Sequence, residues 1–258
     1  MPFVEVGDLR THYALTGDKE PVLVFSNSLG TDFSMWDPQM KKLQHRFRIL
    51  RYDTRGHGQS SVTPADYSIE QLGRDVLGLL DSLGLDRVHF CGLSMGGMIG
   101  MWLAVHAPTC LHRLVLSNTA ARIGTKEMWN ARIATVRKGG MKPVAAAVIE
   151  RWFTPEFRVS SKEEVARAQR MLEKSPPEGY AACCAAIREM DQREAVAQIK
   201  APTLVIYGGN DPVTPAADAH FLTGQIPRAV EVELAAAHLS NVEQADAFTE
   251  AVSSFLSK

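Results

Sequence analysis

The chain has 258 residues, with 28 lysines and arginines against 29 aspartates and glutamates, and so a formal net charge of −1. This balance gives no reason to expect nucleic acid or a membrane surface as a partner. The length suits a single α/β domain with an insertion, and no apolar run approaches the roughly 18 to 20 residues that span a bilayer.

The amino-terminal segment predicts an antiparallel hairpin, because Gly7-Asp8 separates two strand patterns at 3–6 and 9–15. The apolar run 21–25 then predicts a central parallel strand. Alternating patterns follow, with helices at 35–43, 68–83, 99–106 and 241–255 and strands at 47–52, 88–91, 113–117, 203–207 and 230–234. This order predicts a mostly parallel central sheet with helices on both faces.

One segment interrupts this alternation. From residue 121 to residue 194 the pattern is helical, and four helices are expected, at 126–138, 142–153, 162–174 and 178–190. Helices inserted between two strands of such a sheet are expected to cover the carboxyl ends of the strands, where ligands bind. We therefore expect an α/β core, residues 1–120 and 195–258, with a helical cap, residues 121–194, inserted after the sixth strand.

The cysteines and the first residues indicate a compartment. Four cysteines lack the spacing of a zinc site, and two of them, Cys183 and Cys184, are adjacent. Adjacent cysteines seldom pair without strain, so all four are expected to be buried thiols in a reducing environment. Residues 1–6 lack the charged and apolar segments of a secretory signal. We therefore expect a cytoplasmic protein.

The segment Gly92-Leu93-Ser94-Met95-Gly96-Gly97 places a serine between a predicted strand and a predicted helix. This matches the nucleophile elbow, a tight turn whose small flanking residues leave the serine hydroxyl exposed. The Met95 amide, at the helix start, then points toward any oxyanion formed beside Ser94. A glycine-rich turn with a helix-capping serine is the alternative interpretation.

A serine nucleophile needs a base that a third group orients. Asp211 follows the predicted strand 203–207 and His238 follows 230–234, in the order serine, acid, histidine that accompanies this motif. Taken alone, Asp211 fits an ordinary turn and His238 a surface or capping position. The three residues in this order, each directly after a strand, favour a catalytic triad. His57 also lies in a glycine-rich loop, and we interpret it as a turn residue.

A second oxyanion donor is expected from the loop after strand 21–25, whose sequence is Ser26-Asn27-Ser28-Leu29-Gly30. The donor there is the Leu29 amide. Related esterases commonly carry His-Gly where this chain has Asn27-Ser28. Because a backbone group donates, this departure leaves the predicted role intact.

With these motifs, the chain resembles the α/β-hydrolase superfamily over essentially its whole length. The segment from Tyr52 to Ser60 is similar to the D-x-R-G-x-G-x-S loop of cap-bearing members. The nearer resemblance is to the 3-oxoadipate enol-lactonases of the β-ketoadipate pathway, which degrades aromatic compounds. It is carried by residues 26–31, Trp36-Asp37, residues 92–97 and Asn118-Thr119-Ala120-Ala121-Arg122-Ile123-Gly124.

This resemblance implies a serine esterase that opens 3-oxoadipate enol-lactone with water to give 3-oxoadipate. Ser94 would attack the lactone carbonyl, His238 would take its proton and Asp211 would orient the imidazole. The amides of Leu29 and Met95 would receive the oxyanion. No metal ion or organic cofactor is implied.

An anionic lactone needs a cation inside an otherwise apolar pocket. In the predicted helix 126–138, Trp129 and Arg132 share one face with Ile133 and Val136, so Trp129 and Arg132 are the predicted substrate-binding residues. The alternative places Arg132 on a solvated edge and Trp129 in the packed interior of the cap. Trp152 and Arg188 are second choices.

Two other functions stay open at this point. A general carboxylesterase or a cofactor-free perhydrolase would use the same triad with a different pocket. A hydrolase-like receptor or binding module would keep the fold without turnover, although the presence of all three triad residues favours an enzyme. The expected partner is a small-molecule substrate, and assembly into a homo-oligomer is left open.

Overall fold

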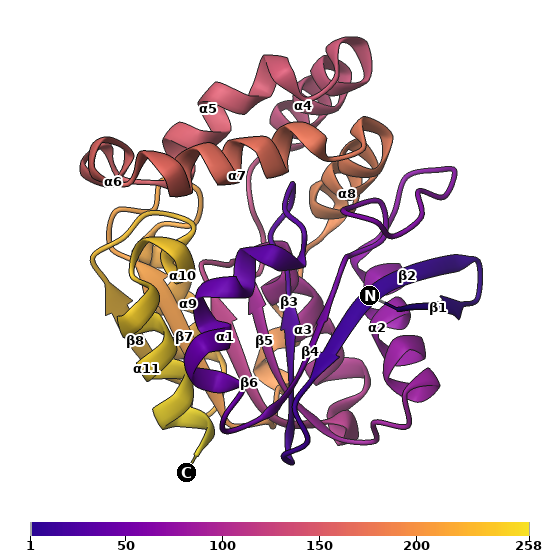
Figure 1. The fold of residues 1–258 in the computed structure, drawn as a ribbon, viewed down its shortest axis with the longest axis vertical. Coiled ribbons are helices and arrows are strands. Elements are labelled where there is room, and N and C mark those ends of the chain that lie inside the picture. The colour runs from indigo at the N-terminus through magenta and orange to yellow at the C-terminus, as the bar shows by residue number, and fades with distance from the viewer. Residues whose placement is uncertain (1, 258) are drawn as a thin grey trace.

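The computed structural model of the protein describes residues 2–257 and contains an eight-stranded sheet (Figure 1). The strands lie in the order β1-β2-β4-β3-β5-β6-β7-β8. β1 (Phe3–Val6) and β2 (Leu9–Thr16) form the predicted antiparallel hairpin, and Gly7 in its turn has a φ of 59°. β2 also pairs antiparallel with β4 (Arg48–Tyr52), whereas the later neighbouring pairs are parallel. The predicted, mostly parallel sheet is confirmed.

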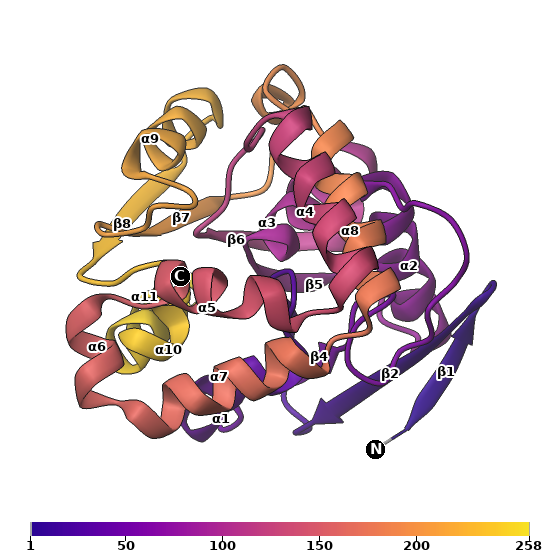
Figure 2. The same ribbon diagram turned by 90° about the horizontal axis from the view of Figure 1, so that it is seen from above.

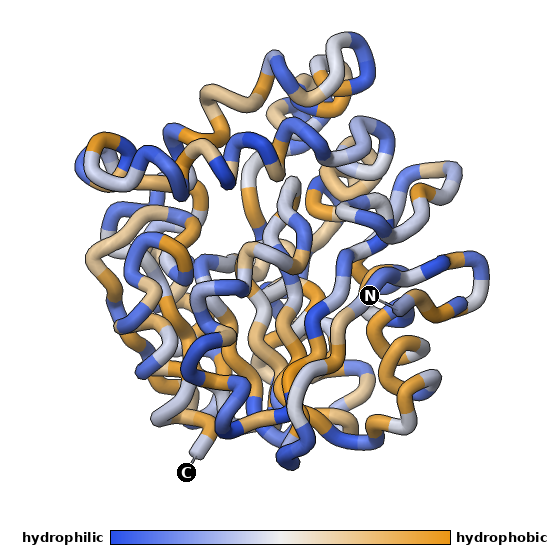
Figure 3. Tube along the Cα trace, in the orientation of Figure 1, coloured by the Kyte–Doolittle hydropathy of each residue, from blue (hydrophilic) through white to orange (hydrophobic). Residues whose placement is uncertain are grey.

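The central strands are apolar because both faces of the sheet are covered. In β3 (Val22–Ser26), residues Leu23, Val24 and Phe25 have 0% of their surface exposed. The other parallel strands are β5 (Val88–Leu93), β6 (Leu111–Ser117), β7 (Thr203–Gly208) and the edge strand β8 (Val230–Leu234). Figure 3 shows apolar residues concentrated along the central strands and hydrophilic residues on the outer segments.

Two groups of helices cover the sheet (Figure 2). One face is covered by α1 (Asp37–Leu43) and α11 (Ala245–Leu256), and the other by α2 (Ile69–Ser82), α3 (Met95–His106) and α9 (Ala216–Gln225). The predicted start of α2 is confirmed, since the Ser68 hydroxyl accepts a hydrogen bond from the Gln71 amide at 3.0 Å. The core also contains three 3₁₀ turns among the described residues. They are η1 (Phe33–Trp36), η2 (Pro108–Cys110) and η3 (Ala195–Gln198).

One helical element of the core differs from the prediction. The closing helix expected at 241–255 is divided into α10 (Ser240–Glu243) and α11. Gln244 separates them, because its φ of −122° and ψ of 52° lie outside the helical region. Helix α9 buries Ala219 and Leu222, which are three positions apart.

Five helices form a layer over the carboxyl ends of the strands (Figures 1 and 2). They are α4 (Lys126–Gly139), α5 (Lys142–Trp152), α6 (Pro155–Ser160), α7 (Lys162–Lys174) and α8 (Pro177–Glu189). Four were predicted, and α6 is the missing one. It lies between the predicted helices 142–153 and 162–174. Thr154 caps it by accepting a hydrogen bond from the Phe157 amide, and Pro155 is its first residue. We propose that residues 121–194 form a cap on a core made of residues 1–120 and 195–258.

All four cysteines are free thiols. Cys91, Cys183 and Cys184 are buried as expected, whereas Cys110 is partly exposed at the end of η2. Burial raises the pKa of the Cys184 thiol to about 12, which keeps it protonated and unreactive. Within residues 2–257, no helix combines the length and the apolar character needed to cross a bilayer.

Candidate active site

Ser94 lies at the turn between β5 and α3. Its φ of 58° and ψ of −116° are unusual for a residue with a side chain and indicate a strained backbone. The neighbouring glycines are required by space. A Cβ atom on Gly92 would lie 2.1 Å from the Gly96 carbonyl oxygen, and one on Gly96 would lie 2.1 Å from the Ser26 carbonyl oxygen. The geometry is that of a nucleophile elbow.

Three hydrogen bonds hold the strained backbone of Ser94. Its amide donates to the carbonyl of Ser117, at the end of β6, at 2.8 Å. Its carbonyl accepts from the Met98 amide at 3.1 Å and from the Thr119 hydroxyl at 2.7 Å. These bonds hold both the amide and the carbonyl of Ser94 in place. The Ser94 side chain lines a cavity.

Neither of the two amides predicted to bind the oxyanion donates a hydrogen bond to another group among residues 2–257. Met95 is the first residue of α3, so its N–H has no acceptor within the helix, and the Leu29 N–H has none among residues 2–257. The loop that carries Leu29 is tied to the elbow, because the Gly96 amide donates to the Asn27 carbonyl at 3.0 Å.

The Asn27 side chain also has a structural role. Its Nδ2 donates to the Tyr52 carbonyl at 2.8 Å, and its Oδ1 accepts from Trp36 Nε1 at 2.9 Å. The departure from His-Gly at positions 27–28 thus supplies an additional anchor for this loop.

Asp211 and His238 meet above the sheet, from the loops after β7 and β8. His238 Nδ1 lies 2.8 Å from Asp211 Oδ2, and both side chains are buried. Burial raises the pKa of Asp211, but the attraction of His238 and its hydrogen bonds outweigh burial and leave the pKa at about 2. The carboxylate is therefore ionised at neutral pH and fixes the proton of the imidazole on Nδ1, which leaves Nε2 as the basic atom.

Asn118, at the end of β6, is a further partner of this pair. Its Nδ2 donates to Asp211 Oδ2 at 3.0 Å and to the Ala237 carbonyl at 3.2 Å, next to His238. The hydroxyl of Thr214 donates to the same carboxylate oxygen at 2.7 Å. Asn118 has a φ of 43°, a conformation that asparagine tolerates better than most residues.

Ser94 and His238 line one cavity of about 280 Å³ between the sheet and the helical layer. The Ser94 hydroxyl makes no hydrogen bond to His238 within the described residues, which is common before a substrate aligns such a pair. From the helical layer, the cavity is lined by Ile123, Gly124, Met128, Trp129, Arg132, Val148, Arg151, Trp152, Tyr180 and Ile187. The site is thus a pocket lined mostly by apolar residues, with Ser94 and His238 on one side and two arginines from the helical layer on the other. Asp211 does not line the pocket and contacts it through His238.

The predicted binding residues Trp129 and Arg132 both line this cavity. The guanidinium carbon of Arg132 lies 5.1 Å from the centre of the Trp129 ring, and Trp129 Nε1 donates to the Ile123 carbonyl at 2.9 Å. Of the second choices, Trp152 lines the cavity, whereas Arg188 forms ion pairs with Asp66 and Glu189 outside it.

Arg151, on α5, is a cavity residue that the sequence analysis missed. Burial and, to a smaller extent, the nearby charge of Arg132 lower the pKa of Arg151. Neither arginine has an acidic partner within ion-pair distance among residues 2–257, in contrast to Arg137, which pairs with Asp66. The sequence does contain a pattern that indicates this position. Arg151 lies three positions after the buried Val148, and residues with this spacing share one face of a helix.

Residues 2–257 contain no group of three or more histidine, cysteine, aspartate or glutamate side chains arranged to hold a metal ion.

We compared the chain with known protein families, curated proteins and solved structures. Residues 21–140 match the family model described as the alpha/beta hydrolase fold. The chain is 44% identical to 3-oxoadipate enol-lactonase 2 of Acinetobacter baylyi over 97% of this chain and 94% of that protein. It is 45% identical to the enol-lactonase from Burkholderia xenovorans LB400, whose crystal structure it matches with a TM-score of 0.98 over 100% of both chains. The chain belongs to the enol-lactonase family of α/β hydrolases.

Membership of this family makes the protein a carboxylic-ester hydrolase. A more distant similarity is to a thermophilic esterase from Thermogutta terrifontis, solved with malate bound. That enzyme is 29% identical, with a TM-score of 0.94 over 99% of this chain and 98% of that one. The fold and the hydrolase class that the sequence predicted are confirmed.

Proposed function

We propose that this protein hydrolyses 3-oxoadipate enol-lactone to 3-oxoadipate, a step of the β-ketoadipate pathway of aromatic-compound catabolism. The observation that carries the proposal is the pair of arginines, Arg132 and Arg151, facing Ser94 and His238 across one cavity. The similarity to enol-lactonases over nearly the whole chain supports it.

In this proposal Ser94 Oγ attacks the lactone carbonyl while His238 Nε2 takes its proton. The ionised Asp211 stabilises the imidazolium that forms, as its low pKa permits. The Leu29 and Met95 amides donate to the oxyanion, and each such donor is worth about 3 kcal/mol in the transition state.

The ring oxygen then leaves as an enol, taking a proton from His238, and the enol becomes a ketone. Because an enol is a better leaving group than an alkoxide, this step needs little acid assistance. Water activated by His238 cleaves the acyl-enzyme and releases the second carboxylate of the product.

The two arginines are proposed to bind the carboxylate that the lactone carries. An arginine binds a carboxylate through charge-assisted hydrogen bonds, often two at once. Neither guanidinium is held in an ion pair among residues 2–257, so their positive charges are available for the substrate. The substrate carboxylate would also relieve their mutual repulsion.

The test compares the anionic enol-lactone with a neutral aryl ester. Arg132→Gln and Arg151→Gln are expected to lower kcat/KM for the lactone by about 10- to 100-fold, the value of one charge-assisted hydrogen bond, and mainly through KM. Activity on the ester should change by less than about threefold. Arg137→Gln is the matched control, because Arg137 lies on the same helix as Arg132 but pairs with Asp66 and Glu178.

Equal losses on both substrates would remove the arginines from carboxylate binding. A preference of the unaltered enzyme for neutral esters would instead favour a general carboxylesterase, the alternative that the similarity to the Thermogutta terrifontis esterase supports.

We further propose that the enzyme works in the cytoplasm on a small-molecule substrate. The free thiols of Cys91, Cys110, Cys183 and Cys184 support a reducing compartment.

A further inference from the structure

His57, which the sequence analysis interpreted as a turn residue, is completely buried in the loop after β4. Its Nε2 lies 2.9 Å from the Gly30 backbone nitrogen, and its Nδ1 lies 3.4 Å from the Arg55 carbonyl oxygen. A backbone amide can only donate, so Nε2 must accept and carry no proton. The imidazole is therefore neutral, with its proton on Nδ1. Burial also lowers the pKa of His57 to about 4.

His57 Nε2 accepts a hydrogen bond from the loop that carries Leu29, the proposed oxyanion donor. Gly30 directly follows Leu29, and its φ of 81° is a conformation that favours glycine. The peptide group between Leu29 and Gly30 is planar, so a hydrogen bond to the Gly30 N–H fixes the orientation of that whole group. With this plane fixed, only rotations at the Leu29 Cα atom and before it can turn the Leu29 N–H away from the cavity.

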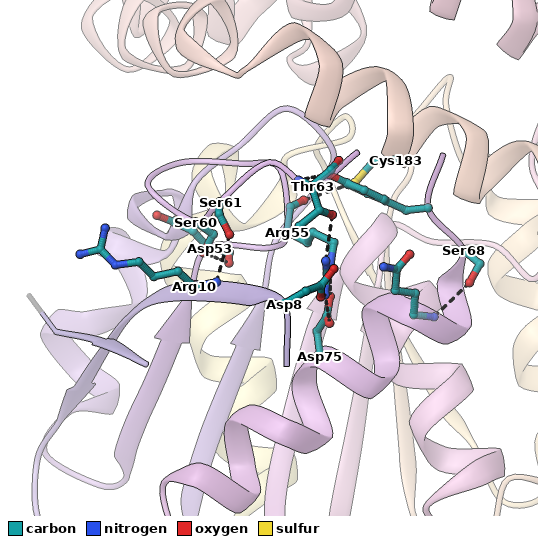
Figure 4. A network of polar contacts seen from close by, with 12 residues as sticks. Asp8, Arg10, Asp53, Arg55, Ser60, Ser61, Thr63, Ser68, Asp75 and Cys183 are labelled. Atoms are coloured by element: carbon teal, nitrogen blue, oxygen red, sulfur yellow. Dashed lines mark hydrogen bonds and ion pairs between the residues drawn. The ribbon is translucent and has the colours of Figure 1, made fainter. Parts of the chain in front are cut away.

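The neighbouring residue Arg55 is anchored by ion pairs with Asp8 and Asp75 (Figure 4). The Arg55 guanidinium, 2% exposed, bonds to Asp75 at 2.6 and 2.7 Å and to Asp8 at 2.9 Å. The Cys183 thiol of α8 lies 3.7 Å from the Arg55 carbonyl oxygen and 3.9 Å from His57 Nδ1. The His57 amide donates to the Thr54 carbonyl at 2.9 Å. Turning the imidazole away from Gly30 would therefore break its contacts with the Arg55 carbonyl oxygen and the Cys183 thiol.

We propose that neutral His57 is a positioning residue of the hydrolytic reaction, which aims the Leu29 amide at the oxyanion by holding the Gly30 peptide. The inference rests on the proposed function of the same site. It does not depend on the identity of the lactone, because an oxyanion forms on any ester that Ser94 attacks.

The test compares two substitutions of His57, one that keeps a hydrogen-bond acceptor for the Gly30 amide and one that removes it. In His57→Gln the side-chain oxygen takes approximately the place of Nε2 and accepts from the Gly30 amide. In His57→Leu the volume is similar and the acceptor is lost. For the Leu variant, kcat on a neutral aryl ester should fall about tenfold or more with KM within about twofold, and the Gln variant should recover most of the loss.

A second measurement separates positioning from support of the fold. A boronic acid that forms a tetrahedral adduct with the serine needs the same oxyanion donors, so its inhibition constant should rise in parallel with the loss of kcat. If the Leu variant does not fold, His57→Met replaces it, since the flexible thioether adapts to irregular space and is a weak acceptor.

The proposal is overturned if kcat falls equally in the Gln and apolar variants, or if the apolar variant keeps its kcat and loses only thermal stability. A failure of the proposed function itself would give a different result. If Ser94 were not the nucleophile, the Ser94→Ala variant would still hydrolyse the ester. A wrong choice of lactone would leave the ester comparison of the His57 variants unchanged.

Discussion

Acid should destabilise this protein partly through His57, and His57→Gln should remove that part. The buried imidazole has a pKa of about 4 in the folded state, against about 6.5 in an unfolded chain. Between these values the unfolded chain binds a proton that the folded one does not, so the free energy of unfolding falls as the pH falls. The full difference corresponds to about 3 kcal/mol, and about 2 kcal/mol of it develops between pH 7.5 and pH 5.

Urea unfolding at pH 7.5 and pH 5 measures this effect. The unaltered protein should lose about 2 kcal/mol more than His57→Gln on going to pH 5. His89 has a similarly lowered pKa of about 4, because of burial and the charges of His112 and Arg113, but it is present in both proteins and cancels in the comparison. His45→Gln, at an exposed position, is the control and should behave as the unaltered protein. Equal pH dependence in the His57→Gln and unaltered proteins would refute the reasoning.

Three further outcomes are expected. Ser94→Ala should lower kcat by about 10⁴-fold or more while calorimetry still detects lactone binding; a loss of only about tenfold would contradict a nucleophilic serine. Asn118→Gly, which tolerates the φ of 43°, should lower kcat about tenfold on lactone and ester alike, because Asp211 loses a donor that orients it, and an unchanged kcat would exclude that role. Gly179→Ala should lower the free energy of unfolding by about 1–3 kcal/mol in urea, because its Cβ would lie 2.1 Å from the Gly56 carbonyl oxygen. Gly224→Ala is the control, because a Cβ atom there would have no other atom within 4 Å, and it should be neutral or stabilising by up to about 1 kcal/mol. Equal effects of the two substitutions on the free energy of unfolding would show that α8 can shift to make room for the added methyl group.

The features that could be predicted from the sequence are those encoded over a few neighbouring residues. The hairpin at Gly7, the Ser68 cap and the elbow around Ser94 each follow from backbone constraints within one turn. The apolar runs of the central strands predicted the sheet because burial on both faces leaves little choice of residue. The order of Ser94, Asp211 and His238 could be recognised because each follows a strand, and parallel strands end at the same edge of the sheet.

Other features were decided by contacts between residues far apart in the chain. Whether a histidine in a glycine-rich loop is a surface turn or a buried acceptor depends on its partner, and the partner of His57 is Gly30, 27 positions earlier. Asn118 reaches a carboxylate 93 positions later. Arg151 faces the cavity because α5 packs against α4 and α7 over the ends of the strands, which its own helical pattern does not specify. Local sequence patterns restrict the backbone within a turn or a strand, whereas the position of a polar side chain relative to a distant group is set only when the helical layer and the sheet pack together.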